Sequence, residues 1–216
     1  MIKAPFYRIY QFSLKLASYF LNIHEPFLIS EENSTGKCGE LLIKKGLKNP
    51  LVVTDNGLYN LGLHKKVISS LEENNLNYAL FYNVNANPTI ANVNEGLKIY
   101  KENNCDSIIA LGGGSALDAA KTIGALVSNP NKDVEKLKGL LHVRKRMPYF
   151  IAIPTTAGTG SESTIAAVLI DEETNHKIPM ADPVIYPRYA ILDPILTKGL
   201  PPFMTATTGM DALTHS

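Results

Sequence analysis

Apolar and polar residues alternate from Leu51 onward in blocks that predict strand, helix and strand in regular succession. Residues 58–73 and 88–103 carry apolar positions at helical spacing. The short apolar runs before, between and after them are typical of buried strands: Leu51–Thr54, Tyr78–Tyr82 and Ser107–Leu111. This alternation implies parallel strands joined by right-handed crossovers. We therefore expect an α/β fold with a Rossmann-like open parallel sheet and flanking helices.

The pattern continues toward the C-terminus. A helix is predicted from Ser115 to Val127, followed by a polar connection over residues 128–147. Further strands are predicted over Tyr149–Ile153, Ala166–Ile170 and Ala190–Leu192. The turn-forming residues 171–175 predict a hairpin after the second of these strands.

The N-terminal region has a different character. Tyr10–Phe20 has apolar residues at helical spacing, which predicts an amphipathic helix in an N-terminal extension over residues 1–25. Its apolar face would pack on its own domain or, alternatively, on a partner or a membrane surface. The segment lacks the clean apolar core of a signal peptide, and no run is long enough to span a membrane. Residues 30–38 are predicted to form a polar loop.

A triple glycine follows the strand at Ser107–Leu111. Gly112–Gly114 allow a sharp turn and a close approach to backbone N–H groups, and a helix begins just after them. We predict Ser115 as the N-cap of this helix, with Asp118 near the capping-box position. The arrangement is typical of a phosphate-binding loop, and a simple tight turn is the alternative.

A second loop rich in glycine and hydroxyl groups, Pro154–Glu162, follows the strand at Tyr149–Ile153. Ligands of open α/β sheets bind at the carboxyl ends of strands, so both loops are expected to face one crevice. Neither loop matches the Gly-x-Gly-x-x-Gly dinucleotide fingerprint or the Walker sequence. A different kind of phosphate-binding family is therefore indicated.

Two acidic positions carry candidate chemistry. Asp55 ends the first regular strand, where a carboxylate can accept hydrogen bonds from a ribose diol and repel a 2′-phosphate; an Asp-Asn-Gly turn is the alternative. Asp211 and His215 lie four residues apart and would project from one face of a helix as metal ligands do. A surface ion pair or a helix cap is the alternative, because catalytic metal sites use three or more protein ligands.

Composition excludes several classes of function. The formal net charge is +1 and no segment is densely basic, so nucleic acid is not an expected partner. Cys38 and Cys105 have neither metal-ligand nor redox spacing, which fits a reducing, cytoplasmic compartment. There is no Gly-x-Ser-x-Gly nucleophile elbow. The chemistry is therefore expected to depend on bound cofactors.

Together these features resemble the iron-containing (group III) alcohol dehydrogenase family. The similar residues keep the order and spacing of the family from about residue 26 onward: Val52–Asp55, Asn87–Thr89, Gly112–Ser115 with Asp118 and Lys121, Pro154–Glu162, Ala190–Pro194 and Gly209–His215. The resemblance implies an NAD(P)-binding α/β domain over residues 26–203. It also implies that residues 204–216 are the first helix of an all-helical metal-binding domain.

The resemblance also assigns roles to residues. NAD is implied as cofactor in preference to NADP, with Asp55 on the adenosine ribose. The other implied cofactor contacts are Asn87, Gly112, Gly113, Gly114, Ser115, Asp118, Thr155, Thr156, Thr159, Lys177 and Leu196. Asp211 and His215 are implied as the first two ligands of a divalent metal, Fe2+ or Zn2+. The substrate would be a small alcohol or aldehyde.

In that family two further histidines from the helical domain complete the metal site, whereas this sequence ends at Ser216. We expect the metal of the complete protein to act as a Lewis acid on the bound alcohol while hydride passes to the nicotinamide. We expect this chain alone to be inactive, and to self-associate through an apolar surface that the helical domain would cover. The alternatives are a non-enzymatic nucleotide-binding or assembly module, or a relative similar to glycerol dehydrogenase or dehydroquinate synthase.

Overall fold

The computed structural model describes Arg8, Phe12 and residues 25–215, with the backbone alone at His215. The amphipathic helix predicted over Tyr10–Phe20 lies, except for Phe12, outside the described residues. Within the described part of the chain, no helix is both long enough and apolar enough to cross a membrane.

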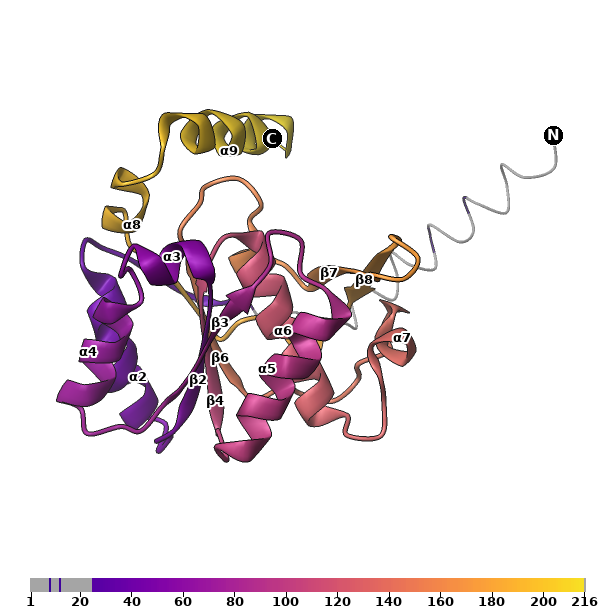
Figure 1. Cartoon of the computed structure of the whole chain (residues 1–216), viewed down its shortest axis with the longest axis horizontal. Helices are drawn as coiled ribbons and strands as arrows, with labels where there is room; N and C mark the ends of the chain where they lie inside the picture. Colours follow the sequence, from indigo (N-terminus) through magenta and orange to yellow (C-terminus); the bar gives the residue numbers. More distant parts are fainter. Residues whose placement is uncertain (1–7, 9–11, 13–24, 216) are drawn as a thin grey trace.

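A six-stranded sheet in the order β1-β9-β6-β4-β2-β3 forms the centre of the molecule, and every neighbouring pair of its strands is parallel (Figure 1). Its strands are β1 (Phe27–Ser30), β2 (Pro50–Asp55), β3 (Ala79–Val84), β4 (Ser107–Gly112), β6 (Tyr149–Pro154) and β9 (Tyr189–Leu192). All residues of β4 are buried, as expected for a central parallel strand covered on both faces. The predicted open parallel sheet is confirmed.

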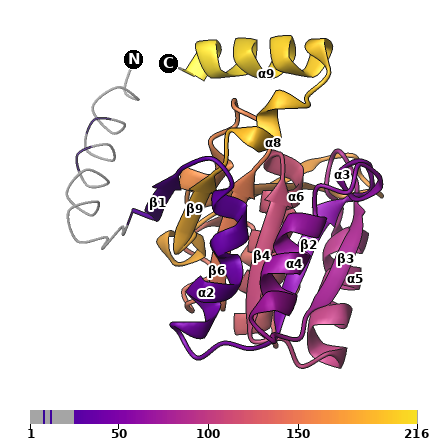
Figure 2. The same cartoon turned by 90° about the vertical axis from the view of Figure 1, so that its left-hand side faces the viewer.

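Helices cover both faces of this sheet (Figures 1 and 2). On one face, α2 (Cys38–Ile43) and α4 (Lys65–Glu73) pack on alternate strand residues such as Val52 and Ile109. On the other face lie α5 (Ile90–Glu102) and α6 (Gly114–Ser128). Successive residues of a strand point to opposite faces, so each buried strand supplies both cores.

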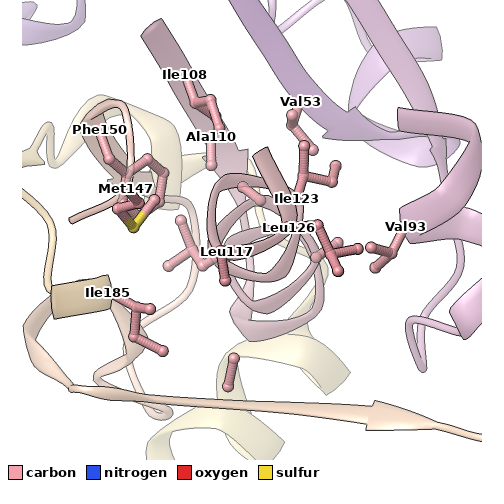
Figure 3. Close-up of a cluster of buried hydrophobic side chains, with 14 of the residues drawn as sticks. Val53, Val93, Ile108, Ala110, Leu117, Ile123, Leu126, Met147, Phe150 and Ile185 are labelled. Carbon is pink, nitrogen blue, oxygen red and sulfur yellow. The ribbon is translucent and has the colours of Figure 1, made fainter. Parts of the chain in front are cut away.

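The helix α6 is at the centre of the larger core. Figure 3 shows three side chains of α6 pointing toward different surroundings: Leu117 toward the segment around Ile185, Ile123 toward the sheet and Leu126 toward α5. A helix that is apolar around most of its circumference is buried on all sides. The structure agrees, since α6 is buried continuously from Ala119 to Leu126.

A second, three-stranded sheet in the order β5-β8-β7 covers the outer side of α6. It contains β5 (Gly139–Leu140), β7 (Ala166–Ile170) and β8 (Lys177–Ala181). The strands β7 and β8 are antiparallel, which confirms the predicted hairpin through residues 171–175. Buried Leu169 and Ile178 of this hairpin belong to the same core as α6.

The structure corrects several local predictions. The single helix predicted over residues 58–73 is two helices, α3 (Asn56–Asn60) and α4. The chain turns between them at Gly62, whose φ of 73° is in the left-handed region that favours glycine. The polar connection over 128–147 contains α7 (Val134–Leu137) and β5.

The region predicted as a polar loop over 30–38 also contains regular structure. It includes the 3-10 helix η1 (Ser34–Lys37) and the beginning of α2, and it follows β1, which pattern reading did not find. The strand β1 is at an edge and its apolar residues Phe27 and Leu28 are exposed, so no alternation of burial marks it.

The carboxyl edge of the six-stranded sheet is covered by the last two helices. These are α8 (Ile195–Lys198) and α9 (Pro202–His215), and α9 lies across the top of the sheet in Figure 1. The loop after β6 rises from the same edge toward α9. This edge therefore brings together the two loops and the acidic positions singled out in the sequence.

Candidate functional site

The candidate site lies where the order of strands reverses. The chain leaves β2 toward β3 on one side and leaves β4 toward β6 on the other, although β2 and β4 are neighbours. Their following helices, α4 and α6, cover opposite faces of the sheet. The carboxyl ends of such diverging strands frame a crevice, which is the usual ligand position in open α/β sheets.

Asp55 and Gly112 end the two diverging strands. One oxygen of Asp55, Oδ1, accepts a hydrogen bond from the Leu58 N–H at 2.9 Å and thereby caps α3. The other oxygen, Oδ2, is 3.6 Å from the position that a Cβ would take at Gly112. The turn and the ligand interpretations of Asp55 are therefore compatible, since the cap uses one oxygen and the other faces the glycine loop.

The glycine loop leads directly into α6. A Cβ at Gly112 would lie 2.6 Å from the Cβ of Ala116, so the close turn from β4 into α6 leaves no room for a side chain there. The N-terminal N–H groups of a buried helix this long are suited to bind an anion, because no intrahelical acceptor is available to them. The loop geometry fits the predicted phosphate site.

The predicted capping box at this helix is wrong. The N-cap residue is Gly113, which has no side chain, and no side-chain cap is formed. Ser115 lies within the helix, and its hydroxyl donates to the Ala86 carbonyl instead. That contact ties the start of α6 to the loop after β3, which includes the exposed Asn87.

The loop after β6, residues 155–160, lies against the glycine loop, residues 112–114, and is called the threonine loop below. The Thr155 N–H donates to the Gly112 carbonyl at 3.0 Å. A Cβ at Gly113 would lie 3.3 Å from Thr156 Oγ1, and one at Gly114 would lie 3.2 Å from Thr159 Oγ1. The predicted pairing of the two loops in one crevice agrees with this geometry, which places two threonine hydroxyls beside two glycines.

Asp118 lies one turn into α6 with both oxygens bound. Oδ1 accepts from Ser161 Oγ at 2.7 Å and Oδ2 accepts from the Val168 N–H at 3.0 Å. Burial raises the pKa of this carboxyl, and these hydrogen bonds together with the nearby Lys121 ammonium act in the opposite direction. Asp118 thus joins α6 to the segment that follows the threonine loop.

The remaining predicted cofactor residues are spread more widely. Lys177 is exposed on β8 and pairs in register with Ile170, whose N–H donates to the Pro88 carbonyl at 2.8 Å, so it lies on the side of Asn87. Leu196 in α8 is buried and packs in the core on the α2 and α4 face. Direct contacts therefore join the glycines to the threonines and to Asp55, whereas the contacts described for Lys177 and Leu196 are with β7 and with the core on the α2 and α4 face.

The helix α9 contacts the threonine loop through Gly158. A Cβ at Gly158 would lie 2.7 Å from the Thr208 carbonyl oxygen and 2.9 Å from Asp211 Oδ2. A helix is thus present over Pro202–His215, and Asp211 lies beside Gly158 of the threonine loop, while its role as a metal ligand stays a prediction. Within the described residues, no group of three or more histidine, cysteine, aspartate or glutamate side chains is placed to hold a metal ion.

Sequence reasoning missed the roles of Ser161 and Lys121. Ser161 was part of a recognised motif, but nothing in the pattern indicated that it bonds to α6 from 43 residues away. The two cysteines behave as expected of structural thiols, since burial raises the pKa of Cys38 to about 12 and that of Cys105 to about 11.

Comparison with known proteins decides the family. Residues 26–194 match the model of the iron-containing alcohol dehydrogenase family. The chain belongs to this family. The match spans the six-stranded sheet, both loops of the crevice and Asp55.

Individual relatives of this iron-containing alcohol dehydrogenase domain agree. Alcohol dehydrogenase 4 of Schizosaccharomyces pombe is 45% identical over 171 residues, which is 79% of this chain and 40% of the relative. Lactaldehyde reductase of Escherichia coli is 41% identical over 174 residues, or 80% of this chain and 46% of the relative. The chain thus spans somewhat less than half the length of these curated relatives.

Solved structures give the same picture. A 1,3-propanediol oxidoreductase superposes with a TM-score of 0.86 at 36% identity, covering 90% of this chain and 51% of that one. An alcohol dehydrogenase from Oenococcus oeni gives a TM-score of 0.84, also at 36% identity, covering 88% of this chain and 50% of that one. The sequence resemblance to the N-terminal portion of the family is confirmed.

Proposed function

We propose that this chain is the NAD-binding part of an oxidoreductase that interconverts small alcohols with aldehydes or ketones. The observation that carries the proposal is the closeness of the ends of β2 and β4, where Asp55 Oδ2 lies 3.6 Å from the position that a Cβ would take at Gly112 of the glycine loop. Support comes from relatives described as an NAD-dependent methanol dehydrogenase of Bacillus methanolicus and a sulfoacetaldehyde reductase in complex with NAD+. The substrate class is inferred from such relatives.

The residues of the crevice fit a dinucleotide. The N–H groups at the start of α6 would bind the pyrophosphate. The missing side chains of Gly113 and Gly114 let Thr156 and Thr159 lie directly against these residues. Asp55 would accept hydrogen bonds from the adenosine ribose hydroxyls through its uncapped oxygen and would repel a 2′-phosphate. We therefore propose NAD as the cofactor in preference to NADP.

The threonine loop would hold the cofactor from the opposite side. Thr156 and Thr159 place hydroxyl groups beside the glycines, where they can donate to phosphate oxygens. When bound, the nicotinamide supplies the chemistry of hydride transfer. What this chain contributes is binding and orientation of the dinucleotide.

The described residues do not by themselves form a metal site. Asp211 and His215 lie on one helix at the edge of the crevice and remain predicted ligands, but no third candidate lies with them in the described part of the chain. We assign no step of the reaction to a metal here. The substrate-binding wall would likewise come from residues outside this crevice.

Titration calorimetry of the 216-residue chain with NADH, NADPH and ADP tests the proposal. NADH and ADP are expected to bind, because both carry the adenosine ribose and the pyrophosphate, and NADPH is expected to bind more weakly. Gly114→Val is expected to weaken NADH binding about tenfold or more, since a Cβ there would lie 3.0 Å from Thr159 Cγ2 and would push the threonine loop away from the glycine loop.

Gly36→Ala is the matched control, because a Cβ there meets no heavy atom within 4 Å. This variant should bind NADH as the unaltered chain does. A chain that binds none of the three nucleotides would contradict the proposal and favour a non-enzymatic assembly module. Equal binding of NADH by the Gly114→Val variant would place the cofactor elsewhere.

A further inference from the structure

Lys121 is a fully buried cation in the middle of α6, with 0% of its surface exposed. The residues around it in the helix are the apolar Ala119, Ala120 and Ile123 of the core. Burying an ammonium group is costly unless its protons are all bound. Its presence in this helix therefore calls for a specific set of acceptors.

Those acceptors all come from one segment. The ammonium Nζ lies within hydrogen-bond distance of five oxygens, and the chain between Ser161 and Ala166 supplies every one of them. They are Ser161 O at 2.6 Å, Ser161 Oγ at 3.1 Å, Thr164 O at 3.0 Å, Thr164 Oγ1 at 2.9 Å and Ala166 O at 2.8 Å. This segment is the continuation of the threonine loop, immediately before β7.

Two electrostatic effects act on the pKa of Lys121 in opposite directions. Burial lowers the pKa of Lys121 to about 8, while the carboxylates of Asp118 and Glu162 act to raise it. An apolar side chain of similar length would avoid this desolvation and would suit the surrounding core. The cation is thus better explained by what it holds than by the packing of α6.

Asp118 extends the same connection. Its carboxylate accepts from Ser161 Oγ, which in turn accepts from Lys121 Nζ. Its second oxygen accepts from the Val168 N–H in β7. One face of α6 therefore binds the whole stretch from Ser161 to Val168, at the point where the threonine loop returns to regular structure.

We propose that Lys121 is a positioning residue that fixes the 161–166 segment and thereby sets the threonine loop against the glycine loop. The proposal rests on the proposed function, because it assumes that the crevice between these loops binds NAD. As a consequence, α6 positions both sides of the proposed NAD site. Its N-terminus faces the pyrophosphate, and its Lys121 anchors the opposite loop.

The test uses the Lys121→Met variant of the full chain, which keeps the length of the side chain and removes the charge. We expect NADH binding to weaken about tenfold. Hydrogen exchange should become faster for the amides of residues 156–166, while those of β4 and β2 stay protected. Lys98→Met is the matched control, since Lys98 is an exposed residue of α5 that forms a surface ion pair with Glu102 at 3.9 Å.

Thr164→Val provides a second, milder variant in case Lys121→Met does not fold. It keeps the side-chain shape and removes one acceptor, so NADH binding should weaken about threefold with faster exchange confined to the same segment. Unchanged NADH binding by a folded Lys121→Met variant would overturn the proposal. A loss of protection spread evenly over β4, β6 and the loop would also overturn it, because that result indicates a purely structural role.

The two proposals can fail separately. An unaltered chain that does not bind NADH overturns the proposed function and, with it, the cofactor-positioning role. Hydrogen exchange in the Lys121→Met variant then still shows whether Lys121 orders residues 156–166. Unchanged exchange over residues 156–166 would show that Lys121 does not order the loop, whether or not NADH binds.

Discussion

Two aspartates end parallel strands at the same edge of the sheet, yet their surroundings differ. Asp193 follows β9 and is 2% exposed. Its carboxylate accepts from the Asn33 N–H at 3.0 Å, the Thr35 N–H at 3.2 Å, Thr35 Oγ1 at 2.8 Å and the Ile195 N–H at 3.2 Å. Asp55 ends β2, is half-buried and accepts one hydrogen bond among the described residues, from the Leu58 N–H.

The difference separates a structural carboxylate from a ligand-binding one. The four donors around Asp193 come from both η1 and α8, so this side chain connects the N-terminal segment of the domain to the end of β9 and has no acceptor capacity directed to a ligand. Asp55 uses Oδ1 for the cap of α3 and keeps Oδ2 toward the glycine loop. An acid at a strand end is thus informative about function only once its partners are counted.

The largest expected effect is on stability. Asp193→Ala should lower the free energy of unfolding by about 3 kcal/mol, because three N–H groups and a hydroxyl lose a charged acceptor, and the two donors of Thr35 are buried. Asp55→Ala should lower it by only about 1 kcal/mol, the usual effect of losing a helix cap. Urea unfolding followed by circular dichroism measures both variants.

Thr35→Val is the graded control for Asp193, since it removes one of the four donors and should lower the free energy of unfolding by about 1 kcal/mol. Equal destabilisation by Asp193→Ala and Asp55→Ala would contradict the distinction between the two carboxylates.

The second prediction concerns cofactor binding, for which a substitution of Asp55 is expected to have a larger effect than one of Asp193. Asp55→Asn should weaken NADH binding about tenfold, because a neutral amide is a poorer acceptor for the ribose hydroxyls than a carboxylate. It should weaken NADPH binding less or improve it, since the repulsion of the 2′-phosphate is lost. Calorimetry with both nucleotides gives the ratio of the two affinities.

Asp193→Asn, studied at a temperature where it is folded, is the control and should leave that ratio unchanged. If the ratio of NADH to NADPH affinities is unchanged in Asp55→Asn, Asp55 does not select the cofactor and acts only as the cap of α3.

The contrast also shows what the sequence could and could not predict. The parallel sheet, both loops and the crevice followed from runs of apolar residues ending in glycine or threonine, because strand direction and loop position fix the carboxyl edge. The apolar pattern alone offered no way to distinguish Asp193 from Asp55, since each ends an apolar run and precedes a turn. What differs is the set of donors, which for Asp193 includes residues 158 and 160 positions away.

The same reason explains the other misses. Lys121 is held largely by backbone carbonyls, and a carbonyl has no signature in the sequence. Ser115 was predicted as a cap because its residue type favours that position, but the glycine turn starts the helix earlier and the hydroxyl finds Ala86. Local propensity predicts the elements, whereas contacts between distant segments decide which polar side chains remain available to a ligand.

The smallest predicted effect is the loss, at low pH, of the stability that Asp193 contributes. It follows from the titration of this carboxylate, which accepts four hydrogen bonds. Burial alone would raise the pKa of Asp193, but the hydrogen bonds from Thr35, Asn33 and Ile195 outweigh it and hold the pKa below its usual range. The folded chain therefore binds this proton less readily than the unfolded chain. The stability that Asp193 contributes is present at neutral pH and is lost as the pH falls below about 4 and through the folded-state pKa.

Asp193→Ala lacks this titration, so the difference in unfolding free energy between the unaltered chain and the variant should narrow from pH 7 to pH 3, by less than its full value at pH 7. Urea midpoints of both proteins across this range measure it, and Thr35→Val should show a partial narrowing because it retains the carboxylate with fewer donors. A difference in unfolding free energy that stays constant from pH 7 to pH 3 would mean that the hydrogen bonds to Asp193 do not favour its ionised form. Asp193 would then stabilise the fold by packing instead of by its charge.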